Sequence, residues 1–231
     1  MTAIADRLAS VRARIGRACA AAGRDPRTVE LLAVSKRHPA ASVREALAAG
    51  QLLFGENRVQ ELLPKAAELE ASPARWHFIG SVQTNKAAAL CAVPSLEVVH
   101  SVDRPRLVER LAAACAELGR ELHVLLQVNA TGEEQKHGVQ PADALDLARE
   151  VVAAGPSLAL DGVMAMGPLE GAPEPVFAEV ATLLARLRDA LGLPLPTLSL
   201  GMSGDLEAAV AAGSTLLRVG TDVFGERPAA G

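Results

Sequence analysis

The sequence predicts a single (β/α)8 barrel of the TIM type, preceded by one extra N-terminal helix. Eight short apolar runs alternate strictly with amphipathic stretches rich in Ala, Leu, Arg and Glu, and no Gly/Ser linker divides the 231 residues. Strands that are apolar without interruption are typical of a parallel sheet covered by helices. We therefore expect one domain over residues 1–231, and an open doubly wound sheet is the alternative architecture.

The individual elements follow from hydrophobic spacing. Ile4, Leu8, Val11 and Ile15 recur at helical intervals and predict an opening helix that ends near Gly23. The predicted strands are 31–35, 52–55, 76–80, 97–101, 123–129, 160–166, 197–201 and 215–220. The predicted helices between and after them lie near 40–49, 57–70, 85–92, 104–118, 141–154, 174–191 and 204–212.

Composition and short motifs exclude several classes of function. The net charge of −4 does not suggest a nucleic-acid or anionic-membrane partner. No apolar run approaches the roughly 18 residues of a membrane helix, and the N-terminus lacks the apolar core of a secretory signal; Asp6 argues against an organelle-targeting helix, the weaker alternative. Three scattered cysteines (Cys19, Cys91 and Cys115) suit a reducing cytoplasm and are interpreted as small buried residues. The five histidines form no HExxH motif and no CxxC exists, so no metal site is expected.

Unusual chemistry gathers where the predicted strands end. These ends carry Ser-Lys-Arg-His at 35–38, Gly-Glu-Asn-Arg at 55–58, Gly-Met-Ser-Gly at 201–204 and Gly-Thr at 220–221. In barrels of this kind, functional groups occupy the loops that follow the strands. The opposite ends look ordinary, so we expect one site at the C-terminal end of the barrel.

Lys36 is the sharpest single feature. The chain has only four lysines, and Lys65 lies in a polar helical stretch where a solvated side chain is expected. Lys36 instead ends an apolar run and is soon followed by Pro39, which ends the local structure. Burial and neighbouring cations lower the pKa of an amine and leave more of it nucleophilic, which suits a ligand with a carbonyl group. The alternative is a solvated lysine at a strand end.

Two glycine-rich turns follow the last two predicted strands. Gly201, Ser203 and Gly204 directly precede a predicted helix, and Gly220 and Thr221 end the eighth strand. Backbone N–H groups at a helix start, glycines that permit close approach and hydroxyl donors together make a phosphate-binding cup. Barrels commonly place a phosphate at these two strand ends. Tight turns that simply require glycine are the alternative for either turn alone.

Arg218 and Asn57 are further candidates for ligand contact. Strand alternation puts Arg218 and Gly220 on one face, and a guanidinium buried in the helix layer without a partner would be costly. We therefore expect Arg218 to face the top of the barrel and meet an anion or a ring nitrogen. A structural salt bridge to Glu56 or Glu226 remains the alternative. For Asn57, N-capping of the next helix is an equally good interpretation.

Other residues near the strand ends receive structural interpretations. Trp76 and His77 are interpreted as core residues. Met164 and Met166 are interpreted as core or pocket-wall residues.

Seven segments resemble the pyridoxal phosphate homeostasis protein family. They are AVSK (33–36), FGENRVQE (54–61), WHFIGSVQTNK (76–86), HSVDR (100–104), VNATGEEQKHGV (128–139), GVMAM (162–166) and LSLGMSGDLEAAVAAGSTLLRVGTDVFGER (198–227). The matches run through most of the chain in the family's order. These proteins are single barrels related to the N-terminal domain of bacterial alanine racemase.

The resemblance implies a cofactor, its site and a role. Pyridoxal 5′-phosphate (PLP) would form a Schiff base with Lys36, and the resemblance gives the other cofactor-binding residues as Asn57, Ser203, Arg218, Gly220 and Thr221. The family is regarded as controlling vitamin B6 pools and has no firm catalytic activity. The sequence departs from many relatives at Arg58, where they carry tyrosine, and its loop at 164–175 is rich in Pro and Gly, so contacts of that loop are not transferred.

Three functions compete: a carrier involved in PLP homeostasis, a PLP-dependent racemase or similar enzyme, and a sugar-phosphate barrel enzyme. Racemisation needs a base on each face of the reacting carbon. In related racemases a tyrosine from a second domain provides one of them, whereas this sequence contains no tyrosine and ends at Gly231 soon after the eighth strand. A histidine or a cysteine could substitute, and His77 and His137 are the conceivable histidines. We expect a cytoplasmic, monomeric, non-catalytic PLP carrier, with PLP-dependent apo-enzymes as candidate partners and no nucleic-acid or membrane partner.

Overall fold

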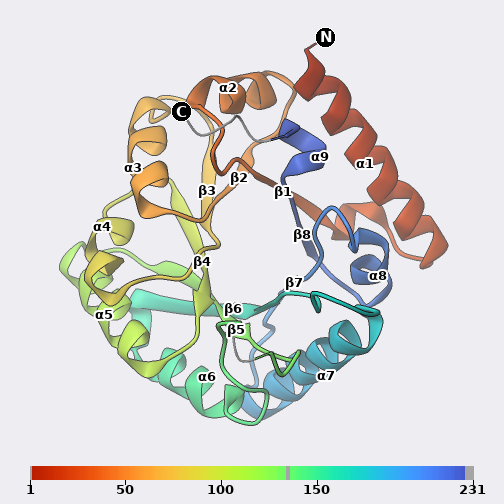
Figure 1. The fold of residues 1–231 in the computed structure, drawn as a ribbon. Coiled ribbons are helices and arrows are strands. Elements are labelled where there is room, and N and C mark those ends of the chain that lie inside the picture. The colour runs from red at the N-terminus through yellow and green to blue at the C-terminus, as the bar shows by residue number, and fades with distance from the viewer. Residues whose placement is uncertain (1, 134–135, 227–231) are drawn as a thin grey trace.

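The eight strands close into one parallel barrel. The computed structural model describes residues 2–133 and 136–226, so Glu134, Gln135 and Arg227 of the family-like segments lie outside the described residues. The strands β1 to β8 follow one another around the barrel in sequence order (Figure 1). Parallel pairing of β1 with β8, from Glu30 opposite Leu216 to Ala33 opposite Val219, closes the ring. The predicted (β/α)8 class is confirmed and the open sheet is excluded.

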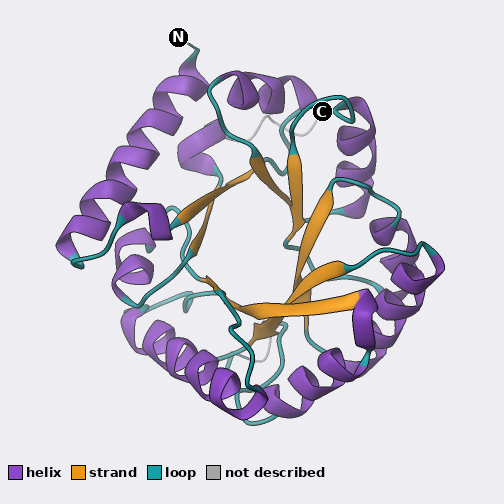
Figure 2. Cartoon of the chain, turned by 180° about the vertical axis from the view of Figure 1, so that it is seen from behind, coloured by secondary structure: helices purple, strands orange, loops and turns teal. Residues whose placement is uncertain are grey.

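Every predicted strand and helix has a counterpart in the structure. The strands are β1 (Glu30–Val34), β2 (Leu53–Glu56), β3 (Arg75–Phe78), β4 (Leu96–Val102), β5 (Leu122–Val128), β6 (Leu158–Ala165), β7 (Thr197–Ser199) and β8 (Leu216–Val219). The helices are α1 (Ala3–Ala21), α2 (Ala40–Ala48), α3 (Val59–Glu68), α4 (Ala87–Cys91), α5 (Pro105–Glu117), α6 (Ala144–Ala153), α7 (Glu174–Leu191), α8 (Leu206–Ala211) and α9 (Thr221–Phe224). The helices form a ring outside the strands (Figure 2). The short helix α9 has no counterpart in the prediction.

The opening helix packs on the end of the chain. The Thr2 side chain caps α1 by accepting a hydrogen bond from the N–H of Ala5, and the predicted apolar face of the helix is buried. Helix α1 lies against α8, α9 and α2 (Figure 1). It therefore touches both segments that follow the last two strands, where the sequence predicts the phosphate cup.

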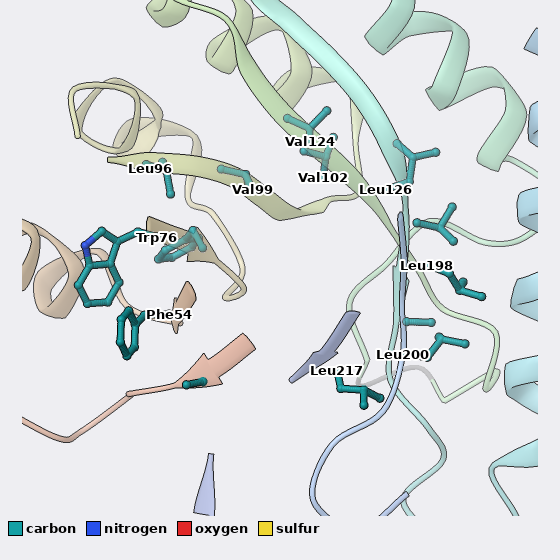
Figure 3. Packing of buried hydrophobic residues seen from close by; sticks show 14 of the residues in the cluster. Phe54, Trp76, Leu96, Val99, Val102, Val124, Leu126, Leu198, Leu200 and Leu217 are labelled. Atoms are coloured by element: carbon teal, nitrogen blue, oxygen red, sulfur yellow. The ribbon is translucent and has the colours of Figure 1, made fainter. Parts of the chain in front are cut away.

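Most of the hydrophobic core lies between the strands and the helices. Outward-facing strand residues fill this layer, among them Phe54 and Trp76, whose rings lie 5.6 Å apart (Figure 3). The three cysteines are buried here as free thiols, as expected. Within the described ranges, no helix is long and apolar enough to span a membrane, and no cluster of His, Cys, Asp or Glu is suited to a metal ion.

Candidate functional site

A cavity of about 350 Å³ opens at the C-terminal ends of the strands. All six residues that the sequence singles out for cofactor binding line it: Lys36, Asn57, Ser203, Arg218, Gly220 and Thr221. Val34, Ile79 and three methionines form its apolar wall, which agrees with the pocket-wall interpretation of Met164 and Met166. The fold thus brings side chains from opposite ends of the sequence to one place.

Lys36 lies at the mouth of the barrel, directly beyond β1. Its side chain is half-buried and lines the cavity together with Val34. The next residue, Arg37, has a φ of 64°, a left-handed conformation that is uncommon for residues other than glycine. The Arg37 N–H donates a hydrogen bond of 2.6 Å to Oε2 of Glu61 in α3. Helix α3 therefore holds the turn that presents the lysine.

The expectation that Lys65 is solvated is wrong. This residue of α3 is 8% exposed and points into the layer between strands and helices. Its Nζ donates to Oε1 of Glu56 at 2.6 Å and to the carbonyl oxygen of Ser35 at 3.0 Å, and it lies 3.4 Å from Oε2 of Glu61. The stretch around Lys65 is polar because the other faces of α3 are solvated, while this lysine is directed at a carboxylate on β2.

Glu56 is the buried acidic member of this network. It is fully buried, and its Oε1 accepts hydrogen bonds from Ser35 and Lys65, whereas its Oε2 has no partner among the described residues. Burial raises the pKa of Glu56, and the charge of Lys65 acts in the opposite direction. The network joins β1, β2 and α3 directly beneath the turn that carries Lys36.

The two glycine-rich turns meet at the side of the cavity formed by β7 and β8. A Cβ atom at Gly201, whose φ is 87°, would lie 2.5 Å from the Cβ of Ala209, so this turn requires glycine to pack on α8. A Cβ at Gly220 would lie 3.2 Å from a carbonyl oxygen of β1. Ser203 and Thr221 line the cavity from these two turns and bring hydroxyl groups to the same region.

Arg14 of α1 ties the two turns together from outside. Its guanidinium donates to the carbonyl oxygen of Ser203 at 2.8 Å and to Asp222 of α9 at 3.1 Å. Two further bonds of 2.6 and 2.7 Å go to the carboxylate of Glu207 in α8. The opening helix therefore fixes the geometry of the cup, a role that sequence reasoning did not assign to it.

Arg218 does not enter the helix layer but lines the cavity at the C-terminal end of the barrel. It is 5% exposed, and it donates to the carbonyl oxygen and Oγ of Ser199 and to the carbonyl oxygen of Ala165, at 2.7 to 2.8 Å. Burial lowers the pKa of Arg218 to about 10, so it stays cationic at neutral pH. The alternative salt bridges are not formed: Glu56 pairs with Lys65, and no ion pair joins Arg218 to Glu226. Among the described residues Arg218 forms no ion pair, although the charge of Asp205 acts to raise its pKa.

Asn57 does not cap the following helix, which was the competing interpretation. Helix α3 begins at Val59, and the capping position is held by Arg58, whose side chain makes no capping bond. Asn57 lines the cavity instead, and its carbonyl oxygen approaches the segment after β3 so closely that a Cβ at Gly80 would lie 2.0 Å away.

His38 is a cavity residue that was not predicted. It is buried, lines the cavity and stacks on Phe224 of α9 with ring centroids 5.2 Å apart. The signal that could have found it is its position two residues after Lys36, in the same strand-end segment.

The N-terminal end of the barrel is not ordinary, contrary to expectation. A larger hollow of about 600 Å³ opens there, lined by charged residues that include Arg75, Glu97, His123 and Asp161. These groups largely satisfy one another, since Arg75 pairs with Glu97 at 2.7 Å and His123 with Asp161 at 2.9 Å. None of the predicted site residues lines this hollow, whereas all six line the smaller cavity at the other end.

Fold and cavity together define a (β/α)8 barrel of the alanine racemase N-terminal type, with a lysine after the first strand and glycine-rich turns after the last two. The family described as "Alanine racemase, N-terminal domain" matches residues 7–228. A solved alanine racemase of Clostridium difficile 630 has a TM-score of 0.67 at 12% identity, with 87% of this chain and 53% of that chain covered, which shows the fold alone.

Relatives with higher sequence identity indicate the family within this fold class. The chain is 49% identical to the pyridoxal phosphate homeostasis protein of Pseudomonas aeruginosa, with 98% of this chain and 97% of that protein covered. For the protein of the same name from Escherichia coli K12 the identity is 42%, with 98% of both chains covered. PipY of Synechococcus elongatus PCC7942, solved with PLP bound, has a TM-score of 0.83 and 41% identity, with 96% of this chain and 100% of that chain covered. The chain belongs to the pyridoxal phosphate homeostasis protein family.

Proposed function

We propose that this protein binds PLP as a Schiff base on Lys36 and acts as a cytoplasmic, monomeric carrier in PLP homeostasis, with PLP-dependent apo-enzymes as recipients. The observation that carries the proposal is the convergence of a half-buried lysine and two glycine-rich turns in one cavity of about 350 Å³. That volume lies in the range of small-molecule sites. The names of the relatives and the PLP-bound PipY structure support the choice of ligand.

The donor set of the cavity fits the three parts of PLP. The cofactor supplies an aldehyde that condenses with an amine, and Lys36 is the lysine that lines the cavity. Ser203, Gly220 and Thr221 offer hydroxyl and backbone N–H donors to the phosphate. Arg218 lies on β8, two residues before the Gly220 turn, and therefore about 6.6 Å deeper in the barrel. At that depth the guanidinium would contact the ring rather than the phosphate, and Asn57, which also lines the cavity, would be a further contact of the cofactor.

The geometry favours a carrier over a racemase. Of the two histidines that could replace the missing tyrosine, His77 is buried away from the cavity and His137 is exposed, and neither lines it. His38 does line the cavity, and it is the specific observation that keeps the racemase as the second candidate. The third alternative, a sugar-phosphate barrel enzyme that uses no PLP, would give Lys36 no specific role.

The phosphate assignment is tested by comparing PLP with pyridoxal, which lacks the phosphate. Several charge-assisted hydrogen bonds, each worth about 1.5–3 kcal/mol, should make pyridoxal bind at least about 100-fold more weakly in a spectroscopic titration. Ser203→Ala and Thr221→Ala should each weaken PLP more than pyridoxal. Thr182→Ala, on the exposed face of α7, is the matched control and should change neither affinity. Equal affinity of the wild-type protein for PLP and pyridoxal would contradict the proposal.

A further inference from the structure

The interior of the barrel contains a stripe of four buried polar side chains. Two small apolar clusters fill the space on its sides, one with Leu32, Leu53 and Leu216 and the other with Val98, Leu125 and Met164. Between them, the barrel interior holds Arg218, Ser199, His100 and His77, each 6% exposed or less. Only Arg218 of these four lines the cofactor cavity, and only His77 lines the hollow at the opposite end.

Hydrogen bonds connect the four side chains in order. Nη1 of Arg218 donates to Oγ of Ser199 at 2.8 Å, and this Oγ lies 3.4 Å from Nδ1 of His100. Nε2 of His100 is 2.9 Å from Nδ1 of His77. Beyond these side chains lies the carboxylate of Glu97, 3.9 Å from Nε2 of His77. A continuous polar path thus runs from the cofactor cavity to an acidic group at the other end of the barrel.

Both imidazoles are neutral at physiological pH. Burial lowers the pKa of His77 to about 3 and holds the pKa of His100 well below its usual value. Each ring therefore carries one N–H, and the shared contact allows one of them to donate and the other to accept. The neighbouring carboxylate of Glu97 favours an N–H at Nε2 of His77, which leaves its Nδ1 to accept from Nε2–H of His100. Nδ1 of His100 then accepts from the hydroxyl of Ser199.

In this arrangement all three hydrogen bonds point the same way, from the guanidinium at the cavity to His77, whose Nε2 faces the carboxylate of Glu97 at 3.9 Å. Aligned bonds polarise one another, and each presents its negative end toward the guanidinium. This matters because Arg218 has no carboxylate within ion-pair distance among the residues that the structure describes. The bonds to Ser199 and Ala165 occupy one side of the guanidinium and leave its remaining N–H donors for a ligand.

We propose that His100 and His77 are positioning residues for the cofactor site: through Ser199 they hold the guanidinium of Arg218 in one orientation at the floor of the cavity. The inference rests on the proposed function, since it assigns Arg218 to the bound cofactor. Neither histidine lines the cavity, so each acts on Arg218 only through the series of hydrogen bonds.

Nuclear magnetic resonance of the cofactor-free protein tests the direction of these hydrogen bonds without any ligand. Long-range ¹H–¹⁵N spectra should show both rings neutral at about pH 7, with the proton on Nε2 of His100 and of His77. A proton on Nδ1 of either ring, or a doubly protonated ring, would overturn the proposed direction. This measurement stands even if the protein fails to bind PLP, a result that would instead contradict the proposed function.

Variants of His100 test the effect on the cofactor. His100→Gln keeps one acceptor and one donor and should bind PLP within about threefold of the wild type, whereas His100→Leu removes both and should weaken PLP about tenfold and shift its visible absorption band. Leu53→Val, in the neighbouring apolar cluster, is the control that perturbs packing without touching the chain and should leave the band unchanged. Wild-type affinity and spectrum in a folded His100→Leu protein would refute the positioning role. If His100→Leu does not fold, shifts of the absorption band that are equally large in His100→Gln and Leu53→Val would refute the positioning role, because they would trace the effect to packing alone.

Discussion

Replacing Lys65 by methionine should show how strongly the fold beneath the Lys36 turn depends on a buried ion pair. Lys65 is the only partner of opposite charge that contacts the fully buried carboxylate of Glu56 within the described residues. Removing one partner of such a pair leaves an uncompensated buried charge and typically costs about 3–5 kcal/mol. Methionine nearly preserves the volume of the lysine stem, so the loss reports on the charge rather than on a cavity. We expect the free energy of unfolding to fall by this amount.

The raised pKa of Glu56 determines how the loss of stability in Lys65→Met changes with pH. Burial raises the pKa of Glu56, so the folded protein binds this proton more readily than the unfolded chain does, and the carboxyl's contribution to stability is lost as the pH rises from the ordinary glutamate range upward. Without Lys65, whose charge lowers that pKa, the loss becomes larger. Lys65→Met should therefore be most destabilising near about pH 8 and less so near about pH 5.

Urea unfolding at the two pH values measures both effects. The double variant Glu56→Gln/Lys65→Met removes the stranded charge and should regain at least about 2 kcal/mol of the loss at the higher pH. A single-variant loss below about 1 kcal/mol, or a double variant no more stable than the single one, would show that the pair does not hold this layer together.

Two further variants and one activity assay have defined expected outcomes. Lys36→Ala should fold with a free energy of unfolding within about 1 kcal/mol of the wild type, because the residue contributes little to the core; loss of the circular-dichroism signal would make it structural. Arg14→Gln should weaken PLP several-fold but not pyridoxal, because it frees the Ser203 turn, and Arg17→Gln on the same helix should change neither; a uniform loss for both ligands would rule out an effect on the phosphate cup. Incubation of the PLP-loaded protein with amino acids in deuterated water should give no racemisation, and turnover of about 1 s⁻¹ or more that disappears in His38→Gln would establish the racemase instead.

Short-range pattern was enough to predict the architecture. Strands buried on both faces and helices with one apolar face leave clear periodicities, so all eight strands were found within a few residues of their bounds. The three-residue strand β7 was predicted too long, because Leu200 continues the apolar run although the backbone has already left the sheet for the Gly201 turn. Helix α9 has four residues and is too short to show a helical period.

The lining of the candidate cavity was predictable where its residues lie at the ends of strands. Lys36, the glycine-rich turns and Arg218 lie at strand ends, and closing the barrel brings strand ends together. The partners of Lys65 and His77 were missed because each depends on the register between elements distant in sequence, which no local pattern contains. A polar helix stretch gives no sign that one of its lysines faces a carboxylate on a neighbouring strand.

The attachment point of the cofactor is the claim on which the functional account depends. The PLP-loaded protein should be reduced with borohydride, digested and mapped by mass spectrometry, with Lys36→Ala treated in parallel. We predict that the pyridoxyl modification resides on Lys36 and that the Lys36→Ala protein yields no stoichiometric adduct. A modification on Lys65, Lys86 or Lys136 with Lys36 unmodified would contradict the assignment.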